Sequence, residues 1–145
     1  METQAIHITR TGTDDPRLAM VENGLDAYNL EFAPQALEVE PFAYIATDNQ
    51  GNFAGGARGK IFAGWMNISL LLAASPKQGL GSKLMHAMEA LAHQKQCRGI
   101  RVDTFAFQAP KFYEKHGYQR YAEIPDYVNG HSRIFYLKRL ESTSQ

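Results

Sequence analysis

Cysteine is nearly absent from this chain of 145 residues, in which Cys97 is the only thiol. A single thiol cannot form an internal disulfide, which excludes the small secreted domains that disulfides hold together. Long apolar runs are also lacking, and residues 1–10 contain no apolar signal core. We therefore expect a cytoplasmic protein with no export signal and no membrane-spanning segment.

An excess of charge of one sign is lacking as well. The 15 Lys and Arg residues balance the 15 Asp and Glu residues, so the formal net charge is zero. Nucleic-acid-binding proteins and proteins held at membranes by basic patches carry a positive excess, so we expect neither kind of partner. The five histidines share no ligand spacing with one another or with Cys97, and we expect no metal site.

The composition that is present suits a globular domain. Hydrophobic residues make up 44% of the chain and charged residues 21%, which is enough apolar surface for one sizeable core. We find no repeat and no low-complexity linker. The sequence predicts a single domain over residues 1–140 and a disordered polar tail over residues 141–145.

Hydrophobic periodicity and turn residues predict an alternation of strands and helices. The first helix starts at Asp14 or Asp15 with Pro16, and ends at Pro34. Helices are also expected over 80–94, which stops at Arg98–Gly99, and over 108–116. The expected strands cover residues 5–11, 42–47, 53–62, 65–73, 100–105, 118–124 and 131–138. This order predicts a mixed α/β domain with too few crossovers for a doubly wound sheet.

A glycine turn opens the helix over residues 80–94. Gly79, Gly81 and Ser82 lie where the unpaired N–H groups of a helix N-terminus can bind an anion. A strand-to-helix turn without a ligand is the alternative, and the two glycines taken alone favour it. A dinucleotide-binding turn needs a third glycine, but Met85 and His86 occupy that region, and the Gly-Lys-Ser or Gly-Lys-Thr of a P-loop is missing.

A second motif changes the meaning of the turn. Residues 113–118 read Tyr-Glu-Lys-His-Gly-Tyr, and residues 77–82 read Lys-Gln-Gly-Leu-Gly-Ser. This pairing resembles the GCN5-related N-acetyltransferase (GNAT) superfamily, whose main helix opens on a glycine turn and whose later signature is Tyr-Glu-Lys, any residue, Gly-Phe or Gly-Tyr. The resemblance implies a central mixed, mostly antiparallel sheet of six to seven strands flanked by helices. It also implies acetyl transfer from acetyl-CoA to a primary amine of a small molecule.

The resemblance further implies a cofactor site between the strands over 65–73 and 100–105, which separate to admit it. Two positions depart from the family, because Pro76 replaces an Arg or Gln and Ala106 replaces a frequent Asn. We expect Lys77 and backbone amides to substitute for the Arg or Gln, and Gln108 or Thr104 to substitute for the Asn. The implied cofactor-binding residues are Leu71, Leu72 and Ala73 for the pantetheine, Lys77, Gln78, Gly79, Leu80, Gly81 and Ser82 for the pyrophosphate, and Phe107, Gln108 and Phe112 for the thiol end.

The catalytic role that the resemblance implies falls on Tyr113, whose phenol would protonate the leaving thiolate. The alternative for Tyr113 is an aromatic residue that only packs the short helix. The sequence does not identify the general base. Glu40, Asp126 and His131 are the candidates. The alternative function is a non-catalytic relative that binds an acyl-CoA or a partner; an unrelated α/β scaffold is a third interpretation. A homodimer through the final strands is also expected.

Overall fold

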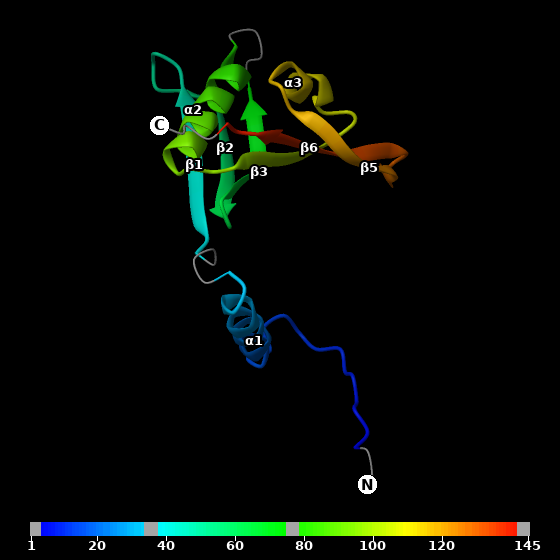
Figure 1. Cartoon of the computed structure of the whole chain (residues 1–145). Helices are drawn as coiled ribbons and strands as arrows, with labels where there is room; N and C mark the ends of the chain where they lie inside the picture. The colour runs from blue at the N-terminus through cyan, green and yellow to red at the C-terminus, as the bar shows by residue number, and fades with distance from the viewer. Residues whose placement is uncertain (1–3, 34–37, 75–78, 142–145) are drawn as a thin grey trace. The chain divides into compact units, whose positions relative to one another are not determined.

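The computed structural model describes residues 4–33, 38–74 and 79–141 (Figure 1). They fall into two compact units, residues 1–37 and residues 38–145, and each is described by itself. None of the helices in the described ranges has the length and apolar character needed to cross a membrane. Residues 142–145 of the predicted tail lie outside the described part. The prediction of a single domain over residues 1–140 stays a prediction.

The described part of the first unit contains one helix, α1 (Leu18–Leu30). The Asp15 side chain accepts a hydrogen bond from the backbone N–H of Arg17 at 2.9 Å, and the helix begins just after that turn. The predicted strand over residues 5–11 is wrong: these residues form no strand, and Ile6 and Ile8 are 89% and 97% exposed. A strand needs a neighbour for its backbone hydrogen bonds, and residues 4–33 contain no other extended segment that pairs with it.

The second unit is a six-stranded sheet in the order β1-β2-β3-β4-β6-β5. Only the β3–β4 pair is parallel, and α2 makes the crossover between these two strands. The prediction of a mixed, mostly antiparallel sheet with flanking helices is confirmed. The elements are β1 (Glu40–Thr47), β2 (Phe53–Phe62), β3 (Trp65–Ala73), α2 (Leu80–Gln94), β4 (Gly99–Phe105), α3 (Pro110–Lys115), β5 (Gln119–Val128) and β6 (His131–Arg139).

Local turn chemistry explains where the last elements differ from expectation. β5 runs four residues further than predicted because a bulge at Asp126, with φ of 51°, keeps the strand paired with β6. The Asn129–Gly130 turn, with φ of 46° and 77°, then closes the hairpin as its sequence predicts. α3 begins at Pro110, a favourable first helical position, and not at residue 108.

The core lies between α2 and the sheet, and Figure 1 shows α2 lying along the strands. α2 is amphipathic, and its spacing of apolar residues puts four buried side chains on one face. Cys97 is buried beyond the end of this helix, and burial raises the pKa of its thiol. The buried residues of α2 are Leu84, Met85, Met88 and Ala92, and the last three belong to one core cluster with Met66, Ile68, Ile100, Val102 and Tyr136 of the sheet.

Gly99 is a packing glycine, and its predicted role as a helix stop is wrong. α2 ends at Gln94, and Gln96 adopts the left-handed conformation, with φ of 58°, that the sequence assigns to a glycine. Gly99 instead opens β4 against the ring of Trp65. A Cβ atom at this position would lie 2.4 Å from Cζ3 of Trp65 and 2.8 Å from the backbone oxygen of Lys138. Only a residue without a side chain fits this approach.

We expect Gly99→Ala to lower the free energy of unfolding by about 2–3 kcal/mol, because the added methyl group overpacks the sheet. Chemical denaturation of the two proteins measures this loss. A Trp65→Leu background is the control, because removing the ring relieves the closer of the two contacts and should recover part of the loss. Equal losses in both backgrounds would contradict this explanation.

Candidate active site

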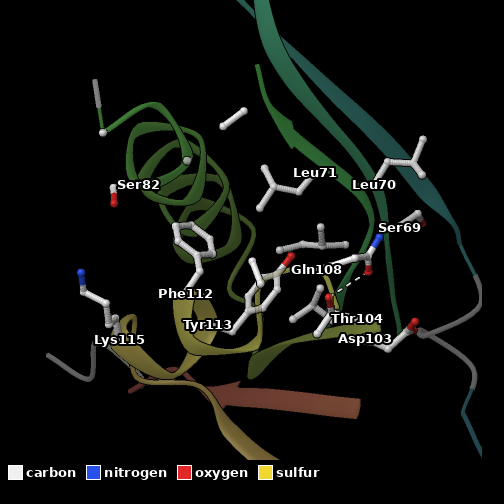
Figure 2. A pocket seen from close by; sticks show the side chains of 16 residues that line it. Ser69, Leu70, Leu71, Ser82, Asp103, Thr104, Gln108, Phe112, Tyr113 and Lys115 are labelled. Carbon is white, nitrogen blue, oxygen red and sulfur yellow. Dashed lines mark hydrogen bonds between the residues drawn. The ribbon is translucent and has the colours of Figure 1, made fainter. Parts of the chain in front are cut away.

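A cavity opens where β3 and β4 part. The two strands pair from Trp65 opposite Gly99 to Ile68 opposite Val102, although both continue beyond that point. This is the separation that the family resemblance implies. The cavity measures about 590 Å³ and is lined by Ile68, Ser69, Leu70, Leu71, Ala73, Gly79, Gly81, Ser82, Val102, Asp103, Thr104, Gln108, Ala109, Phe112, Tyr113 and Lys115 (Figure 2).

A β-bulge marks the point where β3 turns toward the cavity. The β2–β3 register steps from Gly59 opposite Ile68 to Arg58 opposite Leu70, so Ser69 has no residue opposite it. Beyond Ile68, β3 has no ladder to β4, and its backbone groups on that side have no strand partner. Such groups are available to a ligand that lies along the strand.

One end of the cavity is formed by the N-terminus of α2. Gly79 precedes the helix with φ of 65°, and neither a side-chain cap nor an acidic residue occupies the first turn. The first N–H groups therefore lack partners within the helix and carry its partial positive charge. At Gly81 a Cβ atom would come within 3.0 Å of the Phe112 ring, so this glycine keeps the turn close to α3.

Side chains at this end add hydrogen-bonding groups and one cation. The Ser82 hydroxyl lies 3.0 Å from Nε2 of His116, and Lys115 lines the cavity beside it. Burial is the largest effect on the pKa of His116 and lowers it; the Glu89 carboxylate raises this pKa, whereas His86, Lys138 and Lys115 lower it, and the net change is downward. The predicted Lys77 and Gln78, like Pro76, lie outside the described residues.

Tyr113 lies in the middle of the cavity wall. Its ring is 7% exposed and packs against Phe112, Tyr118 and Tyr136. Figure 2 shows its hydroxyl pointing into the cavity. Burial, with a smaller contribution from the Asp103 charge, raises the pKa of this phenol to about 12. The hydroxyl is therefore protonated at neutral pH and can act as a hydrogen-bond or proton donor.

The backbone after α3 fixes the position of Tyr113. Gly117 adopts φ of 87°, as its sequence context predicts. The N–H of Tyr118 donates to the Tyr113 carbonyl at 3.0 Å, and the N–H of Gly117 donates to the Glu114 carbonyl at 3.1 Å. This is a Schellman arrangement, and it explains why a glycine follows the Tyr-Glu-Lys-His segment.

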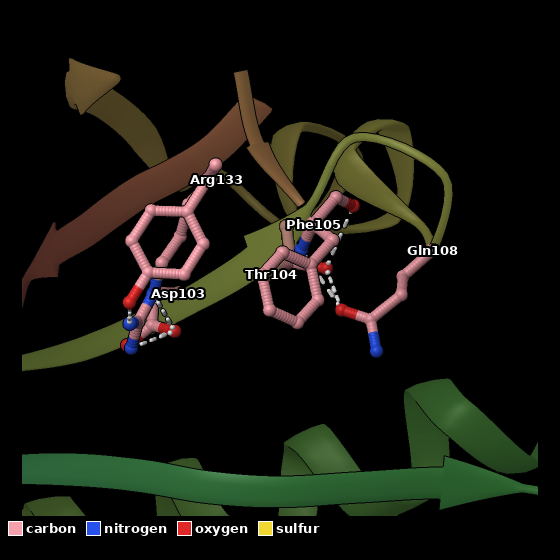
Figure 3. Close-up of polar contacts among 6 residues, drawn as sticks. Asp103, Thr104, Phe105, Gln108 and Arg133 are labelled. Carbon is pink, nitrogen blue, oxygen red and sulfur yellow. Dashed lines mark hydrogen bonds and ion pairs between the residues drawn. The ribbon is translucent and has the colours of Figure 1, made fainter. Parts of the chain in front are cut away.

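Gln108 also lines the cavity, where its side chain is held against β4. Its Oε1 accepts hydrogen bonds from the Thr104 hydroxyl at 2.9 Å and from the backbone N–H of Phe105 at 2.8 Å (Figure 3). A backbone N–H requires an acceptor, so this contact fixes which end of the amide faces β4. The amide nitrogen is therefore turned toward the cavity, where it can donate to a ligand.

Some of the other predicted site residues line the cavity, and others do not. The side chains of Leu71 and Ala73 line the cavity, whereas that of Leu72 does not, because successive residues of a strand face opposite sides. The Leu80 side chain packs near Gly55, and Phe107 stacks on Phe105 outside the cavity wall. The candidate bases do not line the cavity: Glu40 pairs with Lys95 at 2.9 Å, and Asp126 and His131 lie on the final hairpin.

Asp103 is one of the cavity residues that sequence reasoning missed, with Lys115 and Ser69 among the others. Its Oδ1 accepts hydrogen bonds from Arg133 on β6, with Nη2 at 2.8 Å and Nε at 2.9 Å (Figure 3). Nη1 of Arg133 donates to the Tyr127 hydroxyl at 2.9 Å. The available signal was a carboxylate between Val102 and Thr104 of a mostly buried strand, which is a costly place for a charge without a partner.

Comparisons with known proteins agree with this architecture. The family model described as "Acetyltransferase (GNAT) domain" matches residues 41–120. A blasticidin-S acetyltransferase from Streptomyces morookaense is 38% identical over 109 residues, which are 73% of this chain and 80% of that protein. The crystal structure of an acetyltransferase from Bacillus cereus ATCC 14579 is 32% identical with a TM-score of 0.83, over 93% of this chain and 98% of that one.

A more distant structure shares the fold. An acetyltransferase from Bacillus anthracis str. Ames, solved in complex with acetyl coenzyme A, is 19% identical with a TM-score of 0.63, over 70% of this chain and 64% of that one. The family match covers more than half of the chain, and the two closer relatives extend over most of their own length. This chain therefore belongs to the GNAT superfamily and is an acyltransferase of the acetyl-CoA-dependent class.

Proposed function

We propose that this enzyme transfers the acetyl group of acetyl-CoA to a primary amine of a small-molecule acceptor by direct attack. The observation that carries the proposal is the cavity between the parted strands, with an uncapped helix N-terminus and a protonated tyrosine facing the same space. The names of the relatives support it. One is named for blasticidin S, and another was solved with acetyl coenzyme A bound.

In this proposal acetyl-CoA enters at the N-terminus of α2. Its pyrophosphate contacts the amides of residues 78–82, with Lys77 and Lys115 supplying positive charge. The pantetheine lies along β3, where the backbone groups of Leu71, Leu72 and Ala73 are free on the β4 side. The donor N–H of Gln108 replaces the contact that relatives make with an Asn at the position of Ala106. Phe112 packs against the thiol end.

The chemical step needs a neutral amine, a polarised carbonyl and a proton for the leaving group. The amine nitrogen attacks the thioester carbon, the carbon–sulfur bond breaks, and the thiolate takes the proton of the Tyr113 hydroxyl. The amine nitrogen loses its extra proton to solvent, and the tyrosine regains one from solvent. Free backbone N–H groups of β3 would polarise the carbonyl oxygen.

The proposal predicts amine-dependent release of CoA. Thiol release is measured across a panel of primary amines headed by blasticidin S, and the acetylated product is identified by mass spectrometry. Acetyl-CoA should also raise the melting temperature of the protein. Failure of acetyl-CoA to stabilise the protein would overturn the proposal. Stabilisation without thiol release from any amine would favour the alternative of an acyl-CoA-binding relative.

Several other expectations stay predictions. They are the cytoplasmic location, the absence of a metal from the reaction, and the homodimer. β5 is an edge strand whose residues are all exposed, so it remains the surface on which to look for a second subunit. The chain's oligomeric state in solution, measured by light scattering, tests the last of them.

A further inference from the structure

The cavity carries opposite charges at its two ends. Asp103 and Lys115 are the charged residues among the described side chains that line it. Figure 2 shows Lys115 and Ser82 at one end, Asp103 and Ser69 at the other, and Tyr113 between them. The phosphates of a donor belong at the Lys115 end, because the α2 N-terminus is also there. The Asp103 end is then the side from which an acceptor approaches the tyrosine.

The Asp103 carboxylate has one oxygen available to a ligand. Both hydrogen bonds from Arg133 go to Oδ1, and Oδ2 accepts none from the part of the chain that the structure describes. The side chain is 35% exposed and lines the cavity, so Oδ2 is accessible from it. A carboxylate offers about four acceptor positions, and the two contacts at Oδ1 leave the rest unused.

Exposed aromatic rings lie next to this carboxylate. Phe105 follows Asp103 by two residues on β4, so both side chains face the same side of the sheet. Phe107 stacks on Phe105 with ring centroids 5.4 Å apart and an interplanar angle of 7°, and Tyr127 meets Phe105 at 5.9 Å. Phe107 and Tyr127 are 55% and 47% exposed. We call Phe105, Phe107 and Tyr127 the aromatic surface.

The guanidinium of Arg133 positions Asp103 and is not free for a ligand. Nε and Nη2 bind Asp103, Nη1 binds Tyr127, and the rings of Tyr127 and Phe135 lie 5.2 Å from its central carbon. A carboxylate on the acceptor would therefore find no open guanidinium fork at this end. The arrangement favours a cationic acceptor over a zwitterionic amino acid.

We propose that the acceptor is an amine that is cationic in solution and bears a flat apolar group, and that Asp103 selects it. The ammonium group contacts Oδ2 and loses one proton to solvent before it attacks as the neutral amine, and the apolar group lies on the aromatic surface. Exposed aromatic rings also bind ammonium groups and flat apolar groups well. This inference rests on the proposed function, since it assigns the acceptor class of the same cavity.

Binding of simple probes tests the inference. Benzylamine, its neutral isostere benzyl alcohol, and butylamine are titrated into the protein by calorimetry, with and without CoA. We expect benzylamine to bind at least about tenfold more tightly than either of the others, since each lacks one of the two features. Equal binding of benzylamine and benzyl alcohol, or no binding of benzylamine, would overturn the inference, and neither measurement requires a variant.

Two variants locate the effect. Asp103→Asn keeps the shape of the side chain and should make benzylamine bind no better than benzyl alcohol. Phe107→Leu should weaken benzylamine by several-fold and leave butylamine unchanged. Glu123→Gln is the matched control, because this exposed carboxylate on β5 pairs with Arg120 outside the cavity. Retained discrimination in Asp103→Asn, or its loss in Glu123→Gln, would exclude Asp103 as the selecting residue.

The two proposals fail in different ways. If the protein neither binds acetyl-CoA nor releases CoA from it with any amine, the proposed function is wrong whatever the calorimetry shows. If acetyl transfer occurs but phenylalanine or aniline is preferred to benzylamine, the enzyme is confirmed and the inference about Asp103 is wrong. Phenylalanine adds a carboxylate to the probe, and aniline is uncharged at neutral pH, so each tests one part of the argument.

Discussion

Replacement of Tyr113 by phenylalanine is expected to lower kcat by about two to three orders of magnitude, the usual contribution of a positioned proton donor. The affinity for acetyl-CoA should change little, because the phenylalanine ring keeps the packing against Phe112, Tyr118 and Tyr136. Steady-state kinetics with acetyl-CoA and a saturating amine measure the first quantity, and calorimetry with acetyl-CoA measures the second. The substitution removes only the hydroxyl that points into the cavity.

The pH dependence of turnover gives a second test of this role. The raised pKa of Tyr113, about 12, means that the phenol loses its proton only in strongly alkaline solution. Wild-type kcat should therefore show no loss on the alkaline side below about pH 11 that belongs to this residue. On the acidic side, turnover should fall as the acceptor amine becomes protonated, in the wild type and in Tyr113→Phe alike.

Tyr121→Phe is the control for this prediction. It removes the same hydroxyl from a half-exposed tyrosine of β5, which packs against Phe135 and does not line the cavity. Its kcat should stay within about threefold of the wild type. If Tyr113→Phe also stays within that range, the tyrosine only packs α3 against the sheet, and the thiolate takes its proton from elsewhere.

The parts of this fold that the sequence predicted well are those with local signals. The bounds of β2, β3 and α2 are confirmed, because glycine turns and apolar periodicity mark them within a few residues. The Tyr-Glu-Lys-His-Gly-Tyr segment likewise specifies its own helix end, since Gly117 is the residue that closes it. The glycine turn and this segment carry the resemblance to the family, and the resemblance implied the cofactor site between β3 and β4.

The parts that the sequence did not predict depend on contacts between distant residues. Asp103 and Arg133 are 30 residues apart, and only the β4–β6 pairing brings them together. A glycine shortly after a helix is the local signal of a helix stop, but Gly99 is needed because the Trp65 ring on β3 leaves no room for a side chain. The outward position of the Leu72 side chain depends on which face of β3 meets the cavity. None of these facts is encoded within one segment.

A carboxylate placed at the cavity end of α2 should abolish tight binding of acetyl-CoA without harming the fold. In Ser82→Glu the new charge would face the proposed pyrophosphate site and compete for Lys115. Two charges about 5 Å apart at a partly exposed site interact by about 3 kcal/mol, so the KM for acetyl-CoA should rise about a hundredfold. The kcat at saturating acetyl-CoA should change by no more than about threefold.

The helix itself should tolerate this substitution. The first turn of α2 has no acidic residue, and a glutamate there interacts favourably with the helix dipole, so the melting temperature should not fall.

Two control variants separate the effect of the new charge from the loss of the Ser82 hydroxyl. Ser82→Ala removes only the hydroxyl near His116, and Lys83→Glu introduces a carboxylate on the adjacent, exposed side chain outside the cavity. Each should raise the KM by a few-fold at most, because solvent screens a charge that does not face the phosphates. An equal rise in Ser82→Glu and Lys83→Glu would mean that the pyrophosphate does not bind at this helix end, since only a site-specific contact distinguishes the two positions.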